Sequence, residues 1–279
     1  YKPAFAGDRT QVNRVVQALL SAKRPVFYVG GGVIQADAEE PLRALVKASR
    51  GPVASTLMGL GAYPGSDEQS LGMLGMHGTY EANMAMHEAD LILALGARFD
   101  DRVTNDPNKF SPKATIVHLD VDPASVDKII SSDIALVGDA QWVLNTLWEA
   151  YQEQESLRDD AARQKQQQDM EQWWQQIGQW RSAHGLNHNL EPKKDQSILP
   201  QLAVQTLYRV TEGEAFVTSD VGQRQMFAAQ YYHFDEPRRW INSGGLGTMG
   251  FGLPSAMGVQ MGNPDAVVAC VTGEGSFMM

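Results

Sequence analysis

The sequence predicts an α/β protein in which a doubly wound parallel sheet is followed by a second parallel α/β domain. Two observations carry this prediction. Short runs rich in Val, Ile and Leu recur along the chain, and stretches with apolar residues at helical spacing separate them. Glycine follows most of these runs, where a strand would pass into a loop. Continuous apolar strands are typical of parallel sheets, because helices cover both faces of such sheets.

Composition narrows the class of protein. The chain has 279 residues, a length that favours two domains. It carries 23 Lys and Arg against 33 Asp and Glu, a net charge of −10, which argues against binding to nucleic acid or to anionic membranes. No apolar run approaches the roughly 20 residues of a membrane span, and we expect no signal peptide. One cysteine excludes an intrachain disulfide. These features predict a soluble cytoplasmic enzyme.

Five strands are expected in the first domain, residues 1–150. They lie at residues 25–29, 52–57, 91–95, 115–121 and 134–137. Helical patterns cover residues 12–20 and 80–86, and a third helix is expected to open at Asp37, an N-cap type of residue that Glu40 follows three positions later. The alternation of strands and helices predicts the doubly wound sheet.

Residues 151–196 are expected to join the two domains, and they are rich in glutamine and charged residues. Trp173, Trp174 and Trp180 are interspersed in this segment. We interpret it as an exposed helix that its tryptophans dock onto a domain, followed by a loop. A low-complexity interaction tail is the alternative interpretation.

A second α/β unit is expected over residues 197–279. Its predicted strands lie at residues 215–219, 240–242 and 266–271, with helices up to Val210, around 226–231 and up to Met261. Cys270 falls in the last strand and is interpreted as an inert core residue. A parallel-sheet domain does not normally finish so soon after such a strand. We therefore expect this unit to be the first half of a domain.

Ligands of open parallel sheets bind at the carboxyl ends of the strands, so the loops there are the candidate sites. Gly30–Gly32 lacks the G-x-G-x-x-G spacing of a nicotinamide dinucleotide site. Arg98 and Arg102 follow a strand and can pair with phosphate or carboxylate, although a solvated salt-bridge cluster is the alternative. Asp120 and Asp139 end two further strands, where an acid binds a ribose hydroxyl or caps the next helix. A nucleotide with sugar hydroxyls and a diphosphate, FAD or ADP, fits these loops.

Three further residues have candidate roles. His77 lies in a loop among small residues, where binding a ligand is plausible, whereas His118 is interpreted as a strand-packing residue. Glu274 is framed by glycines after an apolar strand. It can supply one oxygen to a hard divalent ion held against a diphosphate, because such an ion takes one or two protein oxygens together with phosphate oxygens.

Five motifs together resemble one known family. Residues 55–61, 72–83, 96–102, 221–226 and 243–250 read STLMGLG, GMLGMHGTYEAN, GARFDDR, VGQRQM and SGGLGTMG. In this order they resemble the catalytic subunit of acetohydroxyacid synthase (acetolactate synthase), a thiamine-diphosphate-dependent enzyme. The match covers nearly the whole chain and is weakest in the glutamine-rich segment.

The resemblance implies three cofactors, which are thiamine diphosphate, Mg²⁺ and an FAD that does no net redox work. It implies that pyruvate is decarboxylated and that the hydroxyethyl unit is transferred to a second pyruvate or to 2-oxobutyrate. The products, acetolactate and acetohydroxybutyrate, belong to branched-chain amino-acid biosynthesis. It also implies a homodimer or homotetramer of catalytic subunits, a small regulatory subunit, and a location in the cytoplasm, or in the plastid if the source is a plant.

The resemblance assigns site residues by position. Those assigned to FAD are Gly31, Gly32, Thr56, Leu57, Met58, Met76, His77, Gly96, Ala97, Arg98, Asp100, Arg102, Asp120, Asp139, Ala140, Gln225 and Met226. Those assigned to thiamine diphosphate are Val221, Gly222, Gln223, Arg224, Gly247, Met249, Gly273, Gly275 and Ser276. Arg102, Gln223 and Met249 are the catalytic candidates: Arg102 would face the acceptor carboxylate, and Met249 would lie under the bent cofactor. Glu274 is the metal ligand.

The chain departs from the family pattern in two respects. The family usually has Asp where Glu274 stands, and the extra methylene places the carboxylate about 1 Å further out, which Mg²⁺ tolerates poorly. The family's catalytic glutamate and a second metal ligand, an asparagine, lie outside this chain. We therefore expect a fragment that is inactive by itself. A glyoxylate carboligase or pyruvate oxidase, or a non-catalytic nucleotide-binding or regulatory module, are the alternatives.

Overall fold

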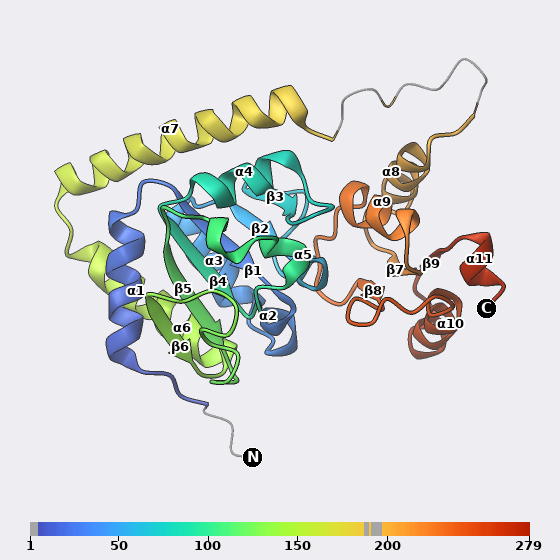
Figure 1. Ribbon diagram of the computed structural model, residues 1–279, viewed down its shortest axis with the longest axis horizontal. Helices are drawn as coiled ribbons and strands as arrows, with labels where there is room; N and C mark the ends of the chain where they lie inside the picture. The colour runs from blue at the N-terminus through green and yellow to red at the C-terminus, as the bar shows by residue number, and fades with distance from the viewer. Residues whose placement is uncertain (1–4, 187–189, 191–196) are drawn as a thin grey trace.

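The computed structural model describes residues 5–186, 190 and 197–279. Its described part contains two sheets whose strand pairs are all parallel, one of six strands and one of three (Figure 1). The larger sheet has the order β3-β2-β1-β4-β5-β6. The chain thus builds outward in one direction from β1 and in the other from β4, so the predicted doubly wound parallel α/β fold is confirmed.

All five strands predicted for the first domain are present in the larger sheet, and a sixth was missed. The strands are β1 (Pro25–Val29), β2 (Val53–Ser55), β3 (Ser70–Met73), β4 (Leu91–Leu95), β5 (Thr115–Asp120) and β6 (Ile134–Val137). The missed strand is β3. It contains a glycine, and only every second residue, Leu71 and Met73, is buried. This pattern fits its position at the edge of the sheet. Its sequence therefore lacks the continuous apolar run of a central strand.

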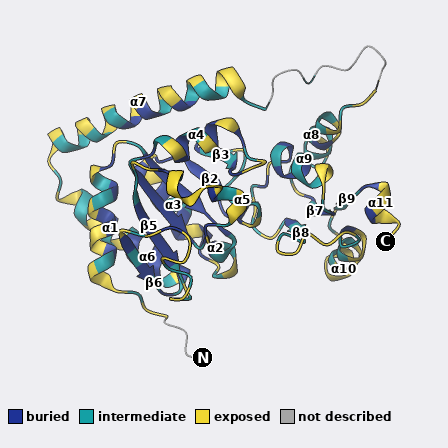
Figure 2. Ribbon diagram, in the orientation of Figure 1, coloured by how far each residue is buried: buried dark blue, intermediate teal, exposed yellow. Residues whose placement is uncertain are grey.

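Helices cover both faces of the larger sheet (Figure 1). Three of them, α1 (Arg9–Ser21), α3 (Glu39–Ser49) and α6 (Ala140–Ser156), pack on the face that Phe27 and Val29 present. The opposite face, which Val26 and Tyr28 present, is covered by α4 (Tyr80–Glu88) and α7 (Asp160–His184). Every residue of β1 is buried, because alternate side chains enter one core or the other (Figure 2). Short helices α2 (Gly31–Gln35), η1 (Leu57–Gly59), α5 (Asp101–Thr104) and η2 (Pro107–Lys109) complete this region.

The predicted N-cap role of Asp37 is wrong. Helix α3 begins at Glu39 with Ala38 at the N-cap position, and Asp37 has a left-handed backbone with φ of 52°. Its carboxylate accepts a hydrogen bond from Arg238 of the second α/β unit. The Asp37 side chain therefore binds Arg238, which is distant in sequence, and does not cap α3.

Helix α7 docks onto the larger sheet through its buried face, as the first interpretation of the glutamine-rich segment predicts. Met170, Trp173 and Ile177 are buried in the core that α4 shares, while the rest of the helix is largely solvent-exposed (Figure 2). The Trp173 indole nitrogen donates to the carbonyl of Pro25 at 3.3 Å. Helix α6 continues past residue 150, the boundary predicted for the first domain, and most of the predicted loop at 187–196 lies outside the described residues.

The second α/β unit contains the smaller sheet, with strand order β8-β7-β9. Its elements are α8 (Pro200–Val210), β7 (Phe216–Ser219), α9 (Gln223–Tyr231), β8 (Trp240–Asn242), α10 (Gly252–Gly262), β9 (Val268–Val271) and α11 (Glu274–Phe277). The prediction that Cys270 is a core residue is wrong for the described chain, because every residue of β9 is only half-buried. What burial there is raises the pKa of the thiol. Among the described residues, no helix combines the length and apolarity needed to cross a bilayer.

Replacing Trp173 by Ala is expected to detach α7 from the sheet. The side chain is 2% exposed, so its loss leaves a cavity that costs about 3–5 kcal/mol of unfolding free energy. Urea unfolding would measure this loss. Trp174→Ala is the matched control, because Trp174 is only half-buried and donates to the carbonyl of Arg50 at 2.9 Å. Equal losses in the two variants would contradict the docking role of Trp173.

Candidate functional site

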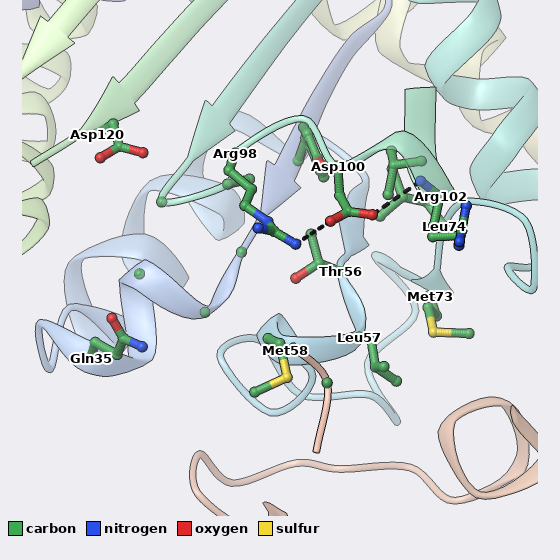
Figure 3. Close-up of a pocket in the computed structure, with 18 of the residues that line it drawn as sticks. Gln35, Thr56, Leu57, Met58, Met73, Leu74, Arg98, Asp100, Arg102 and Asp120 are labelled. Atoms are coloured by element: carbon green, nitrogen blue, oxygen red, sulfur yellow. Dashed lines mark hydrogen bonds and ion pairs between the residues drawn. The ribbon is translucent and has the colours of Figure 1, made fainter. Parts of the chain in front are cut away.

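A cavity of about 660 Å³ lies at the carboxyl ends of the strands of the larger sheet (Figure 3). All six strands of that sheet contribute residues at or just after their last position, and β1 and β4 contribute the two central loops. The direction of winding reverses between these two strands, which is where ligands bind in open parallel sheets. The second unit completes the wall with Gln225, Met226 and Gly244.

Every residue that the resemblance assigns to FAD lines this cavity. The sequence did not identify several other lining residues, five of which directly neighbour predicted ones. The residues missed are Tyr28, Gly30, Gln35, Ala36, Met73, Leu74, Val103, Leu119, Val121, Gly138 and Gly244. Adjacency to a predicted loop could have indicated most of them, whereas Gly244 comes from the other unit and only its glycine-dense turn marked it out.

The two central loops are in backbone contact through glycines. The amide of Gly32 donates to the carbonyl of Gly96 at 3.0 Å, and Gly96 has a φ of 60°. A Cβ atom on Gly30 would lie 2.2 Å from the Gly96 carbonyl oxygen, and one on Gly32 would lie 2.8 Å from the Gly96 Cα. Side chains are therefore excluded here, and bare backbone forms this wall of the cavity.

Arg98 lies in the loop after β4 and Arg102 in the short helix α5 that follows it, and both side chains are largely exposed. The Arg98 guanidinium pairs with Asp100 (Figure 3). The Arg102 guanidinium pairs with Asp101 at 3.0 Å. Burial would raise the pKa of the Asp100 carboxyl, but the Arg102 amide, Asp101 and the charge of Arg98 outweigh this effect and lower it. The carboxylate is therefore ionised at neutral pH. The two arginines form the salt-bridge cluster that was the alternative interpretation, and their solvent-accessible guanidiniums can exchange these partners for a phosphate or carboxylate.

The two acids at the strand ends, Asp120 and Asp139, have different roles in the structure. Asp139 caps α6, because its carboxylate accepts from the amide of Trp142 at 3.1 Å. Asp120 uses Oδ1 to accept from the amide of Asp122 at 2.8 Å, while Oδ2 lies 4.0 Å from His118 Nε2. Asp120 lines the cavity (Figure 3) with this oxygen less engaged, so of the two it is the better partner for a sugar hydroxyl.

His118 holds the loop after β4 from beneath. The ring is 1% exposed, its Nε2 lies 2.9 Å from the carbonyl oxygen of Ala97, and it meets the Phe99 ring edge to face at 4.9 Å. Burial lowers the pKa of His118, and the Ala97 carbonyl offsets this only partly. The interpretation of His118 as a strand-packing residue is confirmed. His118 contacts the carbonyl of Ala97, and Ala97 lines the cavity. By packing beneath this loop, His118 therefore also helps to shape the cavity.

A second cluster of loops lies at the carboxyl ends of β7, β8 and β9. Asp220 connects them, because its carboxylate accepts from the Gly252 amide at 3.0 Å and from the Thr272 hydroxyl at 2.6 Å. Burial would raise the pKa of Asp220, but these hydrogen bonds outweigh it and lower the pKa. Gly247 packs near Val221, and Gly275 packs near Met249. The structure thus brings together the three segments assigned to thiamine diphosphate: Val221–Arg224, Gly247–Met249 and Gly273–Ser276.

Glu274 is an incomplete metal site by itself. Its side chain is 88% exposed, and it accepts a hydrogen bond from Arg224 at 2.7 Å. No group of three or more His, Cys, Asp or Glu side chains is positioned to hold a metal ion in the described part of the chain. A diphosphate-bound Mg²⁺ needs only one or two protein carboxylates, so Glu274 fits as one ligand once Arg224 releases it.

The fold and these two loop clusters define a parallel α/β protein with a candidate nucleotide cavity in one domain and a candidate diphosphate-binding loop cluster in the next. Two family models match the chain: "Thiamine pyrophosphate enzyme, central domain" over residues 12–147, and "Thiamine pyrophosphate enzyme, C-terminal TPP binding domain" over residues 220–279. Relatives match all of this chain. Acetolactate synthase isozyme 3 large subunit of Escherichia coli is 53% identical, the acetolactate synthase large subunit of Haemophilus influenzae 50%, and acetolactate synthase of Mycobacterium avium 41%.

The chain belongs to the thiamine pyrophosphate enzymes and is homologous to acetolactate synthase large subunits, as the sequence motifs predict. It spans about half the length of these relatives, 47% of the Escherichia coli and Haemophilus influenzae proteins and 43% of the Mycobacterium avium protein.

His118→Gln is expected to reduce the acid sensitivity of the fold. Folding lowers the pKa of this histidine below its ordinary value of about 6.5, so the unfolded chain takes up the proton first as the pH falls. The His118 contribution is therefore fully present above that pH and is lost below it, at up to about 1.4 kcal/mol per pH unit. Urea unfolding at pH 7, 6 and 5 would measure the difference between the two proteins. Parallel curves would show that His118 titrates normally.

Proposed function

We propose that this chain supplies the FAD cavity and the diphosphate-binding loops of an acetolactate synthase, a transferase of branched-chain amino-acid biosynthesis. That enzyme decarboxylates pyruvate and joins the two-carbon unit to a second pyruvate or to 2-oxobutyrate, giving acetolactate or acetohydroxybutyrate. One observation carries the proposal: all residues that the motifs assign to FAD, from six strand ends and from the second unit, line one cavity.

The cavity fits FAD in both size and chemistry. Its volume of about 660 Å³ falls within the range of cofactor sites. The glycine wall lets backbone approach a diphosphate, Arg98 can supply positive charge, and Asp120 can accept from a sugar hydroxyl. Leu57 and Met58 add apolar surface for a ring system. The proposed FAD does no net redox work, so these residues bind and shape the site.

The second loop cluster is proposed to bind thiamine diphosphate and Mg²⁺. When bound, thiamine diphosphate supplies the carbanion chemistry, and the protein supplies orientation and electrostatics. Backbone of Gly273, Gly275 and Ser276 would meet the diphosphate, Glu274 would bind the metal, and Arg224 would turn from Glu274 to phosphate oxygens. Gln223 begins α9 at the same loops, and Met249 would support the bent conformer of the cofactor from below.

Arg102 is the proposed partner of the acceptor carboxylate. Its guanidinium is 69% exposed at the cavity and, among the described residues, pairs with the exposed Asp101, so it can turn to a bidentate contact with a 2-oxo acid. Such a contact would orient the acceptor without taking part in proton transfer.

Assembly into homodimers or homotetramers, with a small regulatory subunit, is part of the proposal, as is a cytoplasmic location, or a plastid location in a plant. The relatives are described as large subunits, which supports assembly with a further subunit. The second unit also exposes large apolar side chains that a neighbouring subunit would cover, among them Leu253, Met257, Met261 and Phe277.

Two other functions would give different results. A glyoxylate carboligase would prefer glyoxylate to pyruvate, and a pyruvate oxidase would reduce its flavin during turnover. A non-catalytic nucleotide-binding or regulatory module would bind FAD but would remain inactive within a full-length synthase that contains this chain. The motifs and the relatives favour the synthase over each of these.

Gly32→Ala is expected to weaken FAD binding by about tenfold or more. The new methyl would lie 2.8 Å from the Gly96 Cα and 3.0 Å from its carbonyl oxygen, so the two central loops must separate by tenths of an ångström. Quenching of flavin fluorescence in a titration would measure the affinity. Gly178→Ala is the matched control, because a methyl there meets nothing within 4 Å on the surface of α7, and affinity should stay unchanged. Equal affinity in both variants, or preference for ADP over FAD, would contradict the assignment.

Arg102→Gln, introduced into a full-length synthase containing this chain, is expected to impair the acceptor step more than decarboxylation. Loss of a charged hydrogen-bond partner should raise the KM for the acceptor roughly 10- to 100-fold and divert product from acetolactate to acetaldehyde. Product analysis with pyruvate would measure the ratio. Lys109→Gln, at an 84% exposed lysine, serves as control. An unchanged product ratio would remove Arg102 from the acceptor site.

A further inference from the structure

A single arginine of the second unit, Arg238, holds a short segment of the first domain at three points. Its Nη2 donates to the carbonyl of Ile34 at 2.7 Å and to the carboxylate of Asp37 at 2.6 Å. Its Nη1 lies 3.7 Å from a carboxylate oxygen of Glu39. All three partners lie between the last turn of α2 and the first turn of α3. The guanidinium therefore spans the connection between these two helices.

The segment that Arg238 holds is a wall of the nucleotide cavity. Gly31, Gly32, Gln35 and Ala36 line the cavity, whereas Arg238 does not. Helix α2 has only five residues and cannot be stable by its own hydrogen bonds. The carbonyl of Ile34 in its last turn accepts from the amide of Asp37 at 3.3 Å, and Arg238 adds a charged donor to the same oxygen at 2.7 Å. The position of α2 thus depends in part on a contact from the other unit.

The contact also joins two residues whose left-handed backbone conformations are unfavourable by themselves. Asp37 has a φ of 52° and Arg238 a φ of 60°, and neither is a glycine. A left-handed conformation costs about 1–2 kcal/mol at each such residue, and it persists where surrounding contacts over-determine it. Glu39 adds a third constraint, because its side chain is 12% exposed and the ion pair with Arg238 compensates its buried charge. The two left-handed residues therefore bind each other across the junction.

The loop that carries Arg238 is itself anchored on the first domain. Arg43 of α3 donates to the carbonyl of Asp235 at 2.8 Å, and the Asp235 carboxylate accepts from the amide of Ser66 at 2.8 Å. The amide of Gly65 donates to the carbonyl of Phe234 at 3.0 Å. Arg238 consequently extends from a fixed base, and the chain continues from there through β8 to Gly244.

The same unit also supplies the opposing wall of the cavity. A Cβ on Gly244 would lie 2.2 Å from the sulfur of Met58, so the two units are in direct contact beside the cavity. The Gln230 side chain donates to the carbonyl of His77 at 2.6 Å on the other side. A shift of the second unit would therefore move Gly244 and α2 together.

We propose that Arg238 is a positioning residue for the nucleotide site. It fixes α2 and the second unit in the arrangement that closes the cavity, and it does so without touching the nucleotide. The inference rests on the proposed FAD site for its affinity readout, and on the structure alone for its effect on α2.

Arg238→Met tests the proposal, because it keeps the aliphatic stem and removes the guanidinium. FAD affinity, measured by fluorescence quenching, should fall by about tenfold or more. Arg238→Lys should be intermediate, because an ammonium cannot bridge three partners. Asp37→Ala should reproduce part of the loss and be non-additive with Arg238→Met. Arg163→Met is the matched control: Arg163 is also partly exposed and pairs with Glu155 and Asp160, but it does not line the cavity, and affinity should not change.

Hydrogen exchange in the flavin-free chain separates this inference from the proposed function. Arg238→Met should accelerate exchange at the amides of residues 31–36 while leaving β1 and β4 unchanged. If the unaltered chain binds no FAD, the proposed cofactor is wrong, and the exchange result alone decides the role of Arg238. Unchanged exchange at residues 31–36 overturns the inference, as does unchanged FAD affinity in a chain that binds FAD. If Arg238→Met fails to fold, the same two readouts on Arg238→Lys and Asp37→Ala decide.

Discussion

At the carboxyl ends of β1 and β4, two loops meet backbone to backbone, and the rest of the site depends on this contact. The Gly32 amide donates to the Gly96 carbonyl, and no side chain fits at Gly30, Gly32 or Gly96. β1 and β4 are adjacent at the centre of the sheet, and the chain winds away from them in opposite directions. The cavity therefore opens where the connecting helices diverge, and glycine keeps its floor free of side chains.

The polar groups around the two candidate sites fall into two kinds, exposed ion pairs and buried hydrogen-bonded side chains. Arg98 and Arg102 pair with acids of their own loop, and the low pKa of Asp100 keeps its carboxylate ionised. Exposed ion pairs of this kind contribute little to stability, so exchanging them for a phosphate or carboxylate costs little. Buried polar groups, by contrast, set the geometry. His118 supports the Ala97 carbonyl from the core, and Asp220 connects three loops of the smaller sheet.

The nucleotide cavity is a property of both units. Gln225, Met226 and Gly244 close it from the second unit, while Arg43 and Arg238 hold the connecting loop and α2 in place. Binding of FAD at this junction would thus favour one arrangement of the two units. The segment assigned to thiamine diphosphate, Val221–Arg224, ends immediately before Gln225, so α9 carries residues of both candidate sites.

The sequence by itself determined the class of fold, the five continuous apolar strands and the loops that carry chemistry, because strand burial and loop glycines leave local patterns. The family motifs also assigned residues to FAD, and all of these line the cavity, although several further lining residues were not assigned. Features that depend on contacts between distant residues were decided by the tertiary structure, because local sequence patterns do not indicate them. The sequence does not reveal β3, because an edge strand needs no continuous apolar run. It predicts Asp37 as a helix cap, whereas in the structure the carboxylate binds the distant Arg238. The order of the strands, the meeting of Gly32 with Gly96, and the closing of the cavity by Gly244 all depend on contacts between residues far apart in sequence.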